Sequence, residues 1–442
     1  MMRRLLPAVV LGLLATAAVA PAAAALAAPP PAVPSAAGAP PAAATAAAAH
    51  DPVPVPTEND KVRGYYQRDN AVFVANYVAV VLTAIVVLFT GLSARMRTFA
   101  LRVARVWPLA ILVYLVFFAA IDFLIGLPVA YYAYLRDRDF GVSQEQLGAW
   151  FKDQLLELPV GVLFVAVLMI VFYTFLRWSP RRWWLYVAIP VLLVDLGSQV
   201  VSFATQTQGK GFGPVKDASL AADARALATR AGVGGAGIFQ AEKVKGAATV
   251  GALLGKPRIV LQDPATAKLS AREELSVLGR ALGAYRLRQA IKYSLMRGLL
   301  SIVGFYLLYR AATALIARFK DRFGFDKLSD IASWPLFPAL FNVFFLLVKP
   351  MDVAYARHLQ QESDRFGLEL VQDNRACAES LLAQRAGEPI NPRPGPVYEL
   401  FRGLEPPLAE RVEFCNQYRP WDNGQPLEYG ALFAANHATG RD

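Results

Sequence analysis

Six long apolar segments constrain the fold of this chain more than any other feature of its sequence. They cover approximately residues 72–93, 107–134, 155–176, 183–204, 295–317 and 332–349. A helix of about 20 apolar residues crosses the hydrocarbon layer of a bilayer. The chain of 442 residues is 55% hydrophobic and only 18% charged, a composition that soluble proteins of this length rarely have. The sequence therefore predicts a mainly α protein with several membrane-spanning helices.

Lys and Arg are concentrated in three of the short loops between these segments. The loops contain eleven basic residues: Arg95, Arg97, Arg102 and Arg105; Arg177, Arg181 and Arg182; and Arg318, Lys320, Arg322 and Lys327. Alternation of the six spans puts all three loops on one side, and such a bias marks the cytoplasmic side. This explains the net charge of +11 better than nucleic-acid binding, so we expect membrane lipids as partners and no nucleic acid. Residues 205–291 and 352–442 would then be extracytoplasmic, on the cell (inner) membrane.

The N-terminus has the pattern of a secretory signal. Arg3 and Arg4 precede an apolar core at 5–20, and small residues at 25–27 could precede a cleavage point. We assign residues 1–28 to a signal peptide or, alternatively, to an uncleaved signal anchor. Residues 29–69 begin with an Ala/Pro-rich tract that has almost no charge and little to build a core from, so we expect a disordered tether.

The polar stretches are expected to form one α+β domain that the last two membrane helices interrupt. The predicted order is a membrane domain at 70–204, the first part of the polar domain at 205–292, a membrane hairpin at 293–350, the second part at 351–425 and a flexible tail at 426–442. Within this domain we predict short strands at 238–241 and 258–262 and a helix at 353–376. Cys377 and Cys415 can form a disulfide only if the domain faces an oxidising compartment.

One predicted helix, EELSVLGRALGAYRLRQ at 273–289, has the frame of a zinc-peptidase helix without its reactive residues. In such a helix H-E-x-x-H places two His one turn apart to bind Zn²⁺, with the Glu as general base. Here the two ligand positions hold Arg280 and Ala284, and the base position holds Ala281. Only the apolar frame, including Leu282 and Gly283, remains.

Several further stretches, in a fixed order over about 350 residues, give this frame its context. They are LFTGLSARMR (88–97), FGVSQEQLGAWFKDQL (140–155), WSPRRWWLY (178–186), GKPRIVLQDPATAKLSAREELSVLGRALGAYRLRQ (255–289), QQESDRFGLEL (360–370) and EPPLAERV (405–412). In these stretches the chain resembles the type I CAAX prenyl protease family of integral-membrane zinc metalloendopeptidases. The resemblance implies a helical bundle enclosing a chamber. It also implies a small α+β zincin-like domain split by the last two membrane helices.

The departures from the family pattern fall at the reactive positions. The Glu of E-x-x-A-D, the third zinc ligand of the family, is Gln360 here, and the His of H-P-P is Glu405. The N-A-Y strand beside the substrate aligns near residues 247–249 and lacks its Asn and Tyr. Asp263 and Asp364 survive and could orient backbone or outer-shell groups. The candidates for the substrate groove or for outer-shell support are therefore Ala247, Thr249, Asp263, Asp364 and Glu405.

These losses lead us to expect no zinc and no catalysis. A catalytic Zn²⁺ has three protein ligands and one open position, whereas the aligned positions supply no ligand and place a permanently charged guanidinium there. Replacement histidines are scarce: His50 and His437 lie near the chain ends, and His358 faces about 200° away from Gln360 on its helix. We read His358 as an ordinary surface or capping residue. As zinc is the cofactor of the active family members, we expect no cofactor in this chain.

Two functions remain open. The first is a pseudoprotease that binds or regulates peptides, lipidated peptides or membrane proteins without cleaving them. The alternative is an active metalloendopeptidase with a divergent site, acting in CAAX-box processing or membrane-protein quality control. The topology inferred from the basic loops differs from that of the eukaryotic relatives, whose metal domain faces the cytosol. The difference would disappear if segment 183–204, which contains Asp195, did not fully span.

Charged residues in apolar surroundings need partners. We expect Arg280 to pair with Glu362 or Asp364 and so to replace the metal as a link between two helices, with solvent exposure as the alternative. The membrane-segment carboxylates Asp122, Glu157 and Asp195 are expected to line the chamber, or alternatively to form a proton or ion relay. Arg310 would pair with one of them or face the chamber.

Overall fold

The computed structural model describes residues 51–206, 211–242, 244, 247–253, 256–263, 268–386 and 390–433, and the structural statements below refer to these residues. The predicted signal segment, residues 29–50 of the predicted tether, His50 and His437 lie outside them. The described chain forms two compact units. We call residues 64–195 and 295–350 the helical unit. Residues 51–63, 196–294 and 351–433 form the mixed unit.

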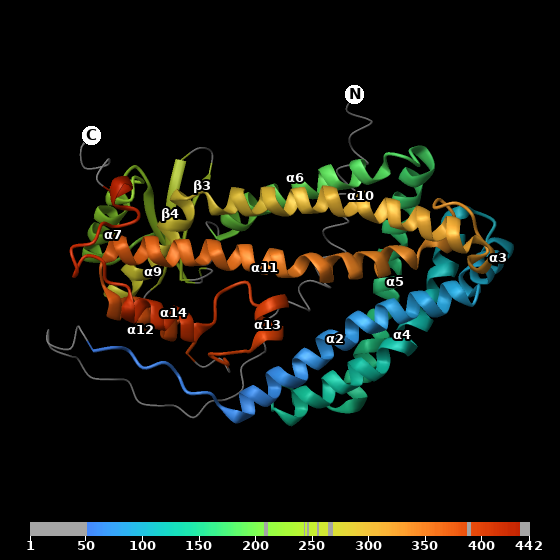
Figure 1. The fold of residues 1–442 in the computed structure, drawn as a ribbon, viewed down its shortest axis with the longest axis horizontal. Coiled ribbons are helices and arrows are strands. Elements are labelled where there is room, and N and C mark those ends of the chain that lie inside the picture. Colours follow the sequence, from blue (N-terminus) through green and yellow to red (C-terminus); the bar gives the residue numbers. More distant parts are fainter. Residues whose placement is uncertain are drawn as a thin grey trace. The chain divides into compact units, whose positions relative to one another are not determined.

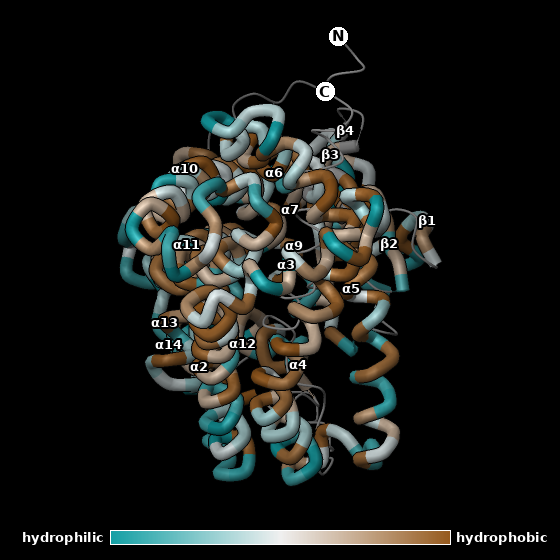
Figure 2. Tube along the Cα trace, turned by 90° about the vertical axis from the view of Figure 1, so that its right-hand side faces the viewer, coloured by the Kyte–Doolittle hydropathy of each residue, from teal (hydrophilic) through white to brown (hydrophobic). Residues whose placement is uncertain are grey.

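Six long helices confirm the predicted apolar segments. They are α2 (Asp60–Phe89), α4 (Trp107–Asp139), α5 (Leu147–Trp178), α6 (Trp183–Gln206), α10 (Gln289–Phe323) and α11 (Leu336–Val371), and all six are long and apolar enough to cross a membrane (Figure 1). Much of the length of these helices is hydrophobic, whereas hydrophilic residues lie at the lower ends of α2 and α4 (Figure 2). Side chains such as Val160, which is 70% exposed, suit a surface that contacts lipid.

Three boundaries differ from the sequence-based expectation. Tyr429 and Phe433, which we expected in a flexible tail, are buried in the core of the mixed unit. Helix α2 begins at Asp60, so residues 60–69 are helical although we expected them in the tether; Asp60 in its first turn favours a helix start. Helix α11 continues through Pro350 to Val371, so the predicted membrane segment and the amphipathic helix after it are one helix. A proline in mid-helix removes one hydrogen bond without necessarily ending the helix, so the two predicted segments are continuous across Pro350.

The three basic loops lie at one end of the helical unit. The first basic loop contains the short helix α3 (Leu92–Val103), and the third leads into the 3₁₀ turn η2 (Ile331–Ser333). The Ser93 hydroxyl of α3 donates to the Ala332 carbonyl oxygen of η2 over 2.6 Å. The Arg177 guanidinium lies 4.1 Å from the ring centre of Trp107, which links the second basic loop to the start of α4. The three basic loops, which we placed on one side from the alternation of the membrane spans, are therefore connected by direct contacts at one end of the helical unit.

Two of the charged residues expected in the membrane segments have defined contacts. Asp195 of α6 forms an ion pair with Arg297 of α10, with 3.2 Å between Oδ1 and Nη1. The partner of Asp195 in this pair is thus Arg297, whereas we had suggested Arg310 as the partner of one of the three membrane-segment carboxylates or as a chamber-facing residue. The exposed Arg310 donates to the Tyr306 hydroxyl one turn earlier, over 3.1 Å.

A four-stranded sheet forms the centre of the mixed unit. Its strands, in the order β1-β2-β4-β3, are β1 (Gly213–Pro214), β2 (Gly237–Ala241), β4 (Lys256–Gln262) and β3 (Ala248–Leu253). Strands β2 and β4 are parallel and the other pairs are antiparallel. The two predicted strands correspond to β2 and β4. Their apolar residues pack with α7 (Ala218–Arg230) and α9 (Ala271–Arg286) around Ile259, Leu278 and Phe366.

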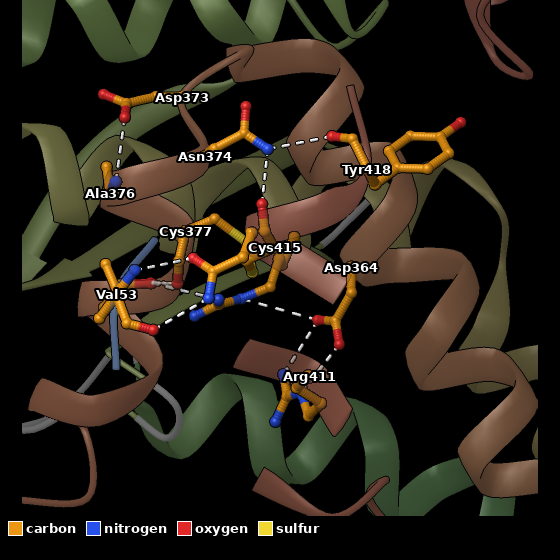
Figure 3. Close-up of a disulfide and its surroundings, with 12 residues drawn as sticks. Val53, Asp364, Asp373, Asn374, Ala376, Cys377, Arg411, Cys415 and Tyr418 are labelled. Atoms are coloured by element: carbon orange, nitrogen blue, oxygen red, sulfur yellow. Dashed lines mark hydrogen bonds and ion pairs between the residues drawn. A yellow bond between two sulfur atoms is a disulfide. The ribbon is translucent and has the colours of Figure 1, made fainter. Parts of the chain in front are cut away.

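Three short helices complete this unit: α12 (Asn374–Ala383), α13 (Pro396–Phe401) and α14 (Leu408–Gln417). A Cys377–Cys415 disulfide joins α12 to α14 (Figure 3). Val53, which we expected in the disordered tether, is buried beside it, because the Asn416 side chain accepts from the Val53 N–H over 3.0 Å and donates to its carbonyl over 2.9 Å. The predicted fold class, a mainly α membrane bundle with a small α+β domain, is confirmed.

Candidate functional site

The zinc-peptidase-like helix α9 crosses α11 at very short range. A capping box of Ser270 and Glu273 starts the helix. A Cβ atom added to Gly367 of α11 would lie 2.6 Å from the Arg280 backbone nitrogen, and one added to Gly283 would lie 2.9 Å from the Phe366 Cβ atom. The crossing therefore requires glycine on both helices. It brings residues 280 and 364 into one buried cluster.

Arg280 is buried at this crossing, with only 7% of its surface exposed. Its Nη1 donates to the Ser380 hydroxyl of α12 over 3.2 Å, and its Nε lies 3.9 Å from Oδ1 of Asp364. Of the two predicted partners Asp364 is confirmed, and the alternative of solvent exposure is wrong. Burial lowers the pKa of Arg280 to about 10, partly offset by the Asp364 charge, so the guanidinium stays charged at neutral pH.

The other predicted partner, Glu362, faces a different set of groups. Its carboxylate lies 3.8 Å from His358 Nε2 and 3.9 Å from Lys292 Nζ. The His358 side chain is 63% exposed, in agreement with its prediction as an ordinary surface residue. Two positions along a helix differ by about 200°, so Glu362 and Asp364 cannot serve the same neighbour.

Asp364, only 3% exposed, is the centre of the cluster. Its Oδ2 accepts from Arg411 Nε over 2.8 Å and its Oδ1 from Arg411 Nη2 over 2.9 Å, a two-pronged guanidinium–carboxylate pair (Figure 3). The Gln360 amide also donates to Oδ1, over 3.1 Å. One carboxylate thus connects α11 to α14 and approaches α9.

Sequence reasoning missed the role of Arg411. The residue lies in the stretch EPPLAERV, which we used for the resemblance without assigning a task to its arginine. The available signal was Asp364 itself, because a buried carboxylate needs a cation or several donors. Burial lowers the pKa of Arg411, but the charges of Asp364 and Glu405 outweigh it and raise the pKa above its ordinary value.

Glu405 connects the cluster to the surface. The side chain is 49% exposed, and its Oε2 accepts from Arg411 Nη1 over 2.8 Å and from Arg385 Nη2 over 3.1 Å. We call Arg280, Asp364, Arg385, Glu405 and Arg411 the arginine–carboxylate cluster. With three cations and two anions it has a small positive net charge.

The other aligned positions contribute no ionisable group. Ala281 packs on the apolar core between helix and sheet, and Ala284 is half-buried on the same helix. The Gln360 amide is engaged with Asp364. Among the described residues, no group of three or more His, Cys, Asp and Glu side chains is arranged to hold a metal ion.

The remaining candidates lie on the sheet. Ala247 has a positive φ of 63°, and its carbonyl accepts from the Gln262 N–H over 2.8 Å. Thr249 pairs with Val260 in the β3–β4 ladder. Asp263 Oδ2 accepts from Gln240 Nε2 and from Lys216 Nζ, each over 3.1 Å, so Asp263 connects the ends of strands.

Glu274 is a second buried carboxyl group, which the sequence analysis did not single out. It is 4% exposed, and neither carboxylate oxygen has a hydrogen-bond partner within the described parts of the chain. Burial raises the pKa of Glu274 to about 7, and the negative charges of Asp263 and Asp217 add to this effect. Its first-turn position on α9 predicts only a favourable helix start.

Fold and site together define a membrane-embedded protein with a zincin-like domain. Residues 56–203 match the family described as CAAX prenyl protease N-terminal, five membrane helices, and residues 214–417 match peptidase family M48. The chain belongs to the CAAX prenyl protease family of membrane metalloproteases, as the sequence resemblance predicted.

Two proteins illustrate this relationship. The chain is 26% identical over 306 residues to YhfN, an uncharacterized metalloprotease of Bacillus subtilis (strain 168), covering 66% of this chain and 70% of that protein. Its fold is similar to the crystal structure of S. mikatae Ste24p with a TM-score of 0.55 and 17% identity, covering 80% of this chain and 88% of that one.

Proposed function

We propose that this protein is a pseudoprotease, a family member that binds peptides, lipidated peptides or membrane proteins without cleaving them. The observation that carries the proposal is the buried Arg280, which stands at the first aligned ligand position and approaches Asp364. A dication placed beside this guanidinium would be repelled, and burial reduces the solvent screening of that repulsion.

The chemistry of the aligned positions supports the same proposal. A catalytic zinc ion needs three ligands, and it lowers the pKa of a bound water so that a nearby base can remove a proton. Alanine at 284 has no lone pair to donate, and Gln360 offers a neutral amide in place of a carboxylate, with its Nε2 donating to Asp364. Ala281 cannot act as a base. The residues present therefore do not fit a zinc ion, and we derive no metal-dependent step.

The arginine–carboxylate cluster supplies the structural link that a metal would otherwise make. Arg280 on α9 and Arg411 on α14 both approach Asp364 on α11, and Ser380 adds a contact from α12. Four helices thus meet through charge-assisted contacts. We infer that the domain keeps its shape without a metal and that its retained function is recognition.

The test uses the purified full-length protein. We expect elemental analysis to find no stoichiometric zinc and peptidase assays on prenylated and unprenylated peptides to find no chelator-sensitive cleavage. A matched variant carries Arg280→His, Ala281→Glu, Ala284→His and Gln360→Glu and should gain zinc if the helical frame is intact. Zinc at about one ion per wild-type chain, or chelator-sensitive cleavage by it, would favour the active alternative and overturn the proposal.

We further propose that the mixed unit lies outside the cytoplasm, on the cell (inner) membrane. The end of the helical unit that gathers the three basic loops has eleven Lys and Arg but only three acidic residues, Asp321, Asp326 and Asp330. Helices α6, α10 and α11 each connect a basic loop to a segment of the mixed unit. The Cys377–Cys415 disulfide independently favours an oxidising compartment.

Labelling with a membrane-impermeant maleimide tests this topology. Gln425→Cys in the mixed unit should react in intact cells. Arg105→Cys at the basic end should react only after the membrane is opened. Both positions are exposed in their own unit, so a difference in labelling reports the membrane side. The reverse pattern would place the mixed unit in the cytoplasm.

A further inference from the structure

Helix α3 has a shallow, open hollow on its surface, at the basic end of the helical unit. The hollow has a volume of about 300 Å³ and is lined by Ala94, Arg95, Thr98, Phe99 and Arg102. These positions follow the spacing of one helix face, so the two guanidinium groups stand two turns apart on the same side. The hollow belongs to neither the arginine–carboxylate cluster nor the sheet.

The arginines of this helix differ in what they contact. Arg97 turns inward and pairs with Asp330 before η2. Arg95 and Arg102 are exposed, and no carboxylate in the described parts of the chain pairs with either. The Thr98 hydroxyl donates to the Ala94 carbonyl oxygen over 2.8 Å, so binding of an anion would depend on the two guanidinium groups. A pair of unneutralised guanidiniums favours phosphate over a neutral ligand.

An aromatic side chain, Phe99, lines the same hollow. Phe99 is 45% exposed and packs edge-to-face on Phe117 of the membrane helix α4, with 5.4 Å between ring centres. Leu101 and Val103 of the same helix, which do not line the hollow, are more than half exposed. Exposed apolar groups between arginines are typical of a helix that lies in the interfacial layer of a bilayer. Contact with α4 places Phe99 beside a transmembrane span.

We propose that this hollow binds the phosphate of an anionic phospholipid in the leaflet at the basic end. Arg95 and Arg102 hold the phosphate oxygens, and Phe99 packs against the first methylene groups of the acyl chains. A zwitterionic lipid would bring its own cation toward the two guanidiniums and would bind less well. The two guanidiniums and the Phe99 ring thus both favour an anionic phospholipid over a zwitterionic one or a free anion.

Native mass spectrometry of the full-length protein with phosphatidylglycerol and phosphatidylcholine tests the proposal. Arg95→Gln with Arg102→Gln should lower the preference for phosphatidylglycerol by roughly tenfold. The matched control, Arg181→Gln with Arg182→Gln, removes the same charge from the same end and should keep the preference. Thermal unfolding of both variants verifies that they fold.

Three results would overturn the proposal. Equal loss in both double variants would reduce the effect to general charge attraction. An unchanged preference in the Arg95/Arg102 variant would place the lipid elsewhere. Displacement of phosphatidylglycerol by millimolar inorganic phosphate would assign the hollow to a free anion instead of a lipid.

Discussion

Two arginines of the arginine–carboxylate cluster and two arginines of helix α3 show opposite uses of one side chain. Arg280 is buried and the Arg411 side chain is only 10% exposed, and their charge is compensated by Asp364 within the domain. Arg95 and Arg102 are exposed and lack such a partner among the described residues. A buried charge must be compensated by the fold, whereas an exposed one remains available to a ligand. The comparison therefore separates arginines that hold the structure from arginines that can recognise something.

The largest effect should come from removing the central carboxylate of the buried cluster. Asp364→Asn keeps the shape of the side chain but leaves two buried guanidiniums without their main counter-charge. We expect a loss of roughly 3–5 kcal/mol in the free energy of unfolding. Chemical unfolding in detergent measures it, with the exposed Asp422→Asn as a control. A loss below about 1 kcal/mol would show that the cluster is not a structural link.

The disulfide provides a second, covalent link in the same region. Cys377→Ala combined with Cys415→Ala should lower the free energy of unfolding by roughly 2–4 kcal/mol, because the bridge limits the unfolded chain over a separation of 38 residues. Reduction of the wild-type protein should lower its free energy of unfolding by a similar amount. The same reducing agent should not change the free energy of unfolding of the double variant. Thiol labelling of the unfolded, unreduced wild type would contradict the pairing, and with it the extracytoplasmic assignment.

Glu274 differs from Asp364, because its carboxylate is buried without a hydrogen-bond partner in the described chain. Its pKa is raised to about 7, so the folded state binds more protons than the unfolded state between the ordinary carboxyl pKa and that value. This contribution to stability is present at low pH and is lost as the pH rises toward 7. We expect Glu274→Gln to be more stable than the wild type at pH 8, by roughly 1–3 kcal/mol.

Unfolding curves at several pH values test this prediction. The difference between Glu274→Gln and the wild type should disappear at low pH, where both side chains are neutral. Glu273→Gln is a suitable control because the neighbouring Glu273 is only half-buried and belongs to the capping box. A stability difference that does not change with pH would mean that Glu274 is already ionised in a solvated site.

The smallest effect is expected for the exposed arginines. Arg95→Gln should change the free energy of unfolding by less than about 0.5 kcal/mol, since an exposed charge without a partner contributes little to folding. The same substitution at Arg411 should destabilise the protein strongly. Equal effects at the two positions would remove the distinction between the two regions.

Much of the fold was predictable because membrane spans are local properties of the sequence. The six apolar segments are long enough to be read directly, and β2 and β4 contain compact apolar runs. Strand β3 was harder to predict, because Ala and Gly fill three of its six positions and carry none of the β-branched and aromatic signal of strands. The docking of Val53 was missed because it depends on Asn416, 363 residues further along the chain.

The candidate site was predictable only in part. The helical frame identified Arg280, and the need to compensate its charge suggested a carboxylate on the second helix. The choice between Glu362 and Asp364 required the rotation of α11 about its axis, and nothing local in the sequence sets that rotation. Arg411 was visible in a motif, yet its partner lies 47 residues away.

The sequence by itself determined the membrane spans, the shared side of the basic loops and the chemical content of the aligned site positions. Each of these depends on residues that are contiguous or a few turns apart. The tertiary structure alone decided that Arg280 is buried, that Asp364 is shared by two arginines and that Glu274 is buried beside other carboxylates. These outcomes depend on the close crossing of α9 and α11 at Gly283 and Gly367, and such a crossing is fixed by packing between distant segments.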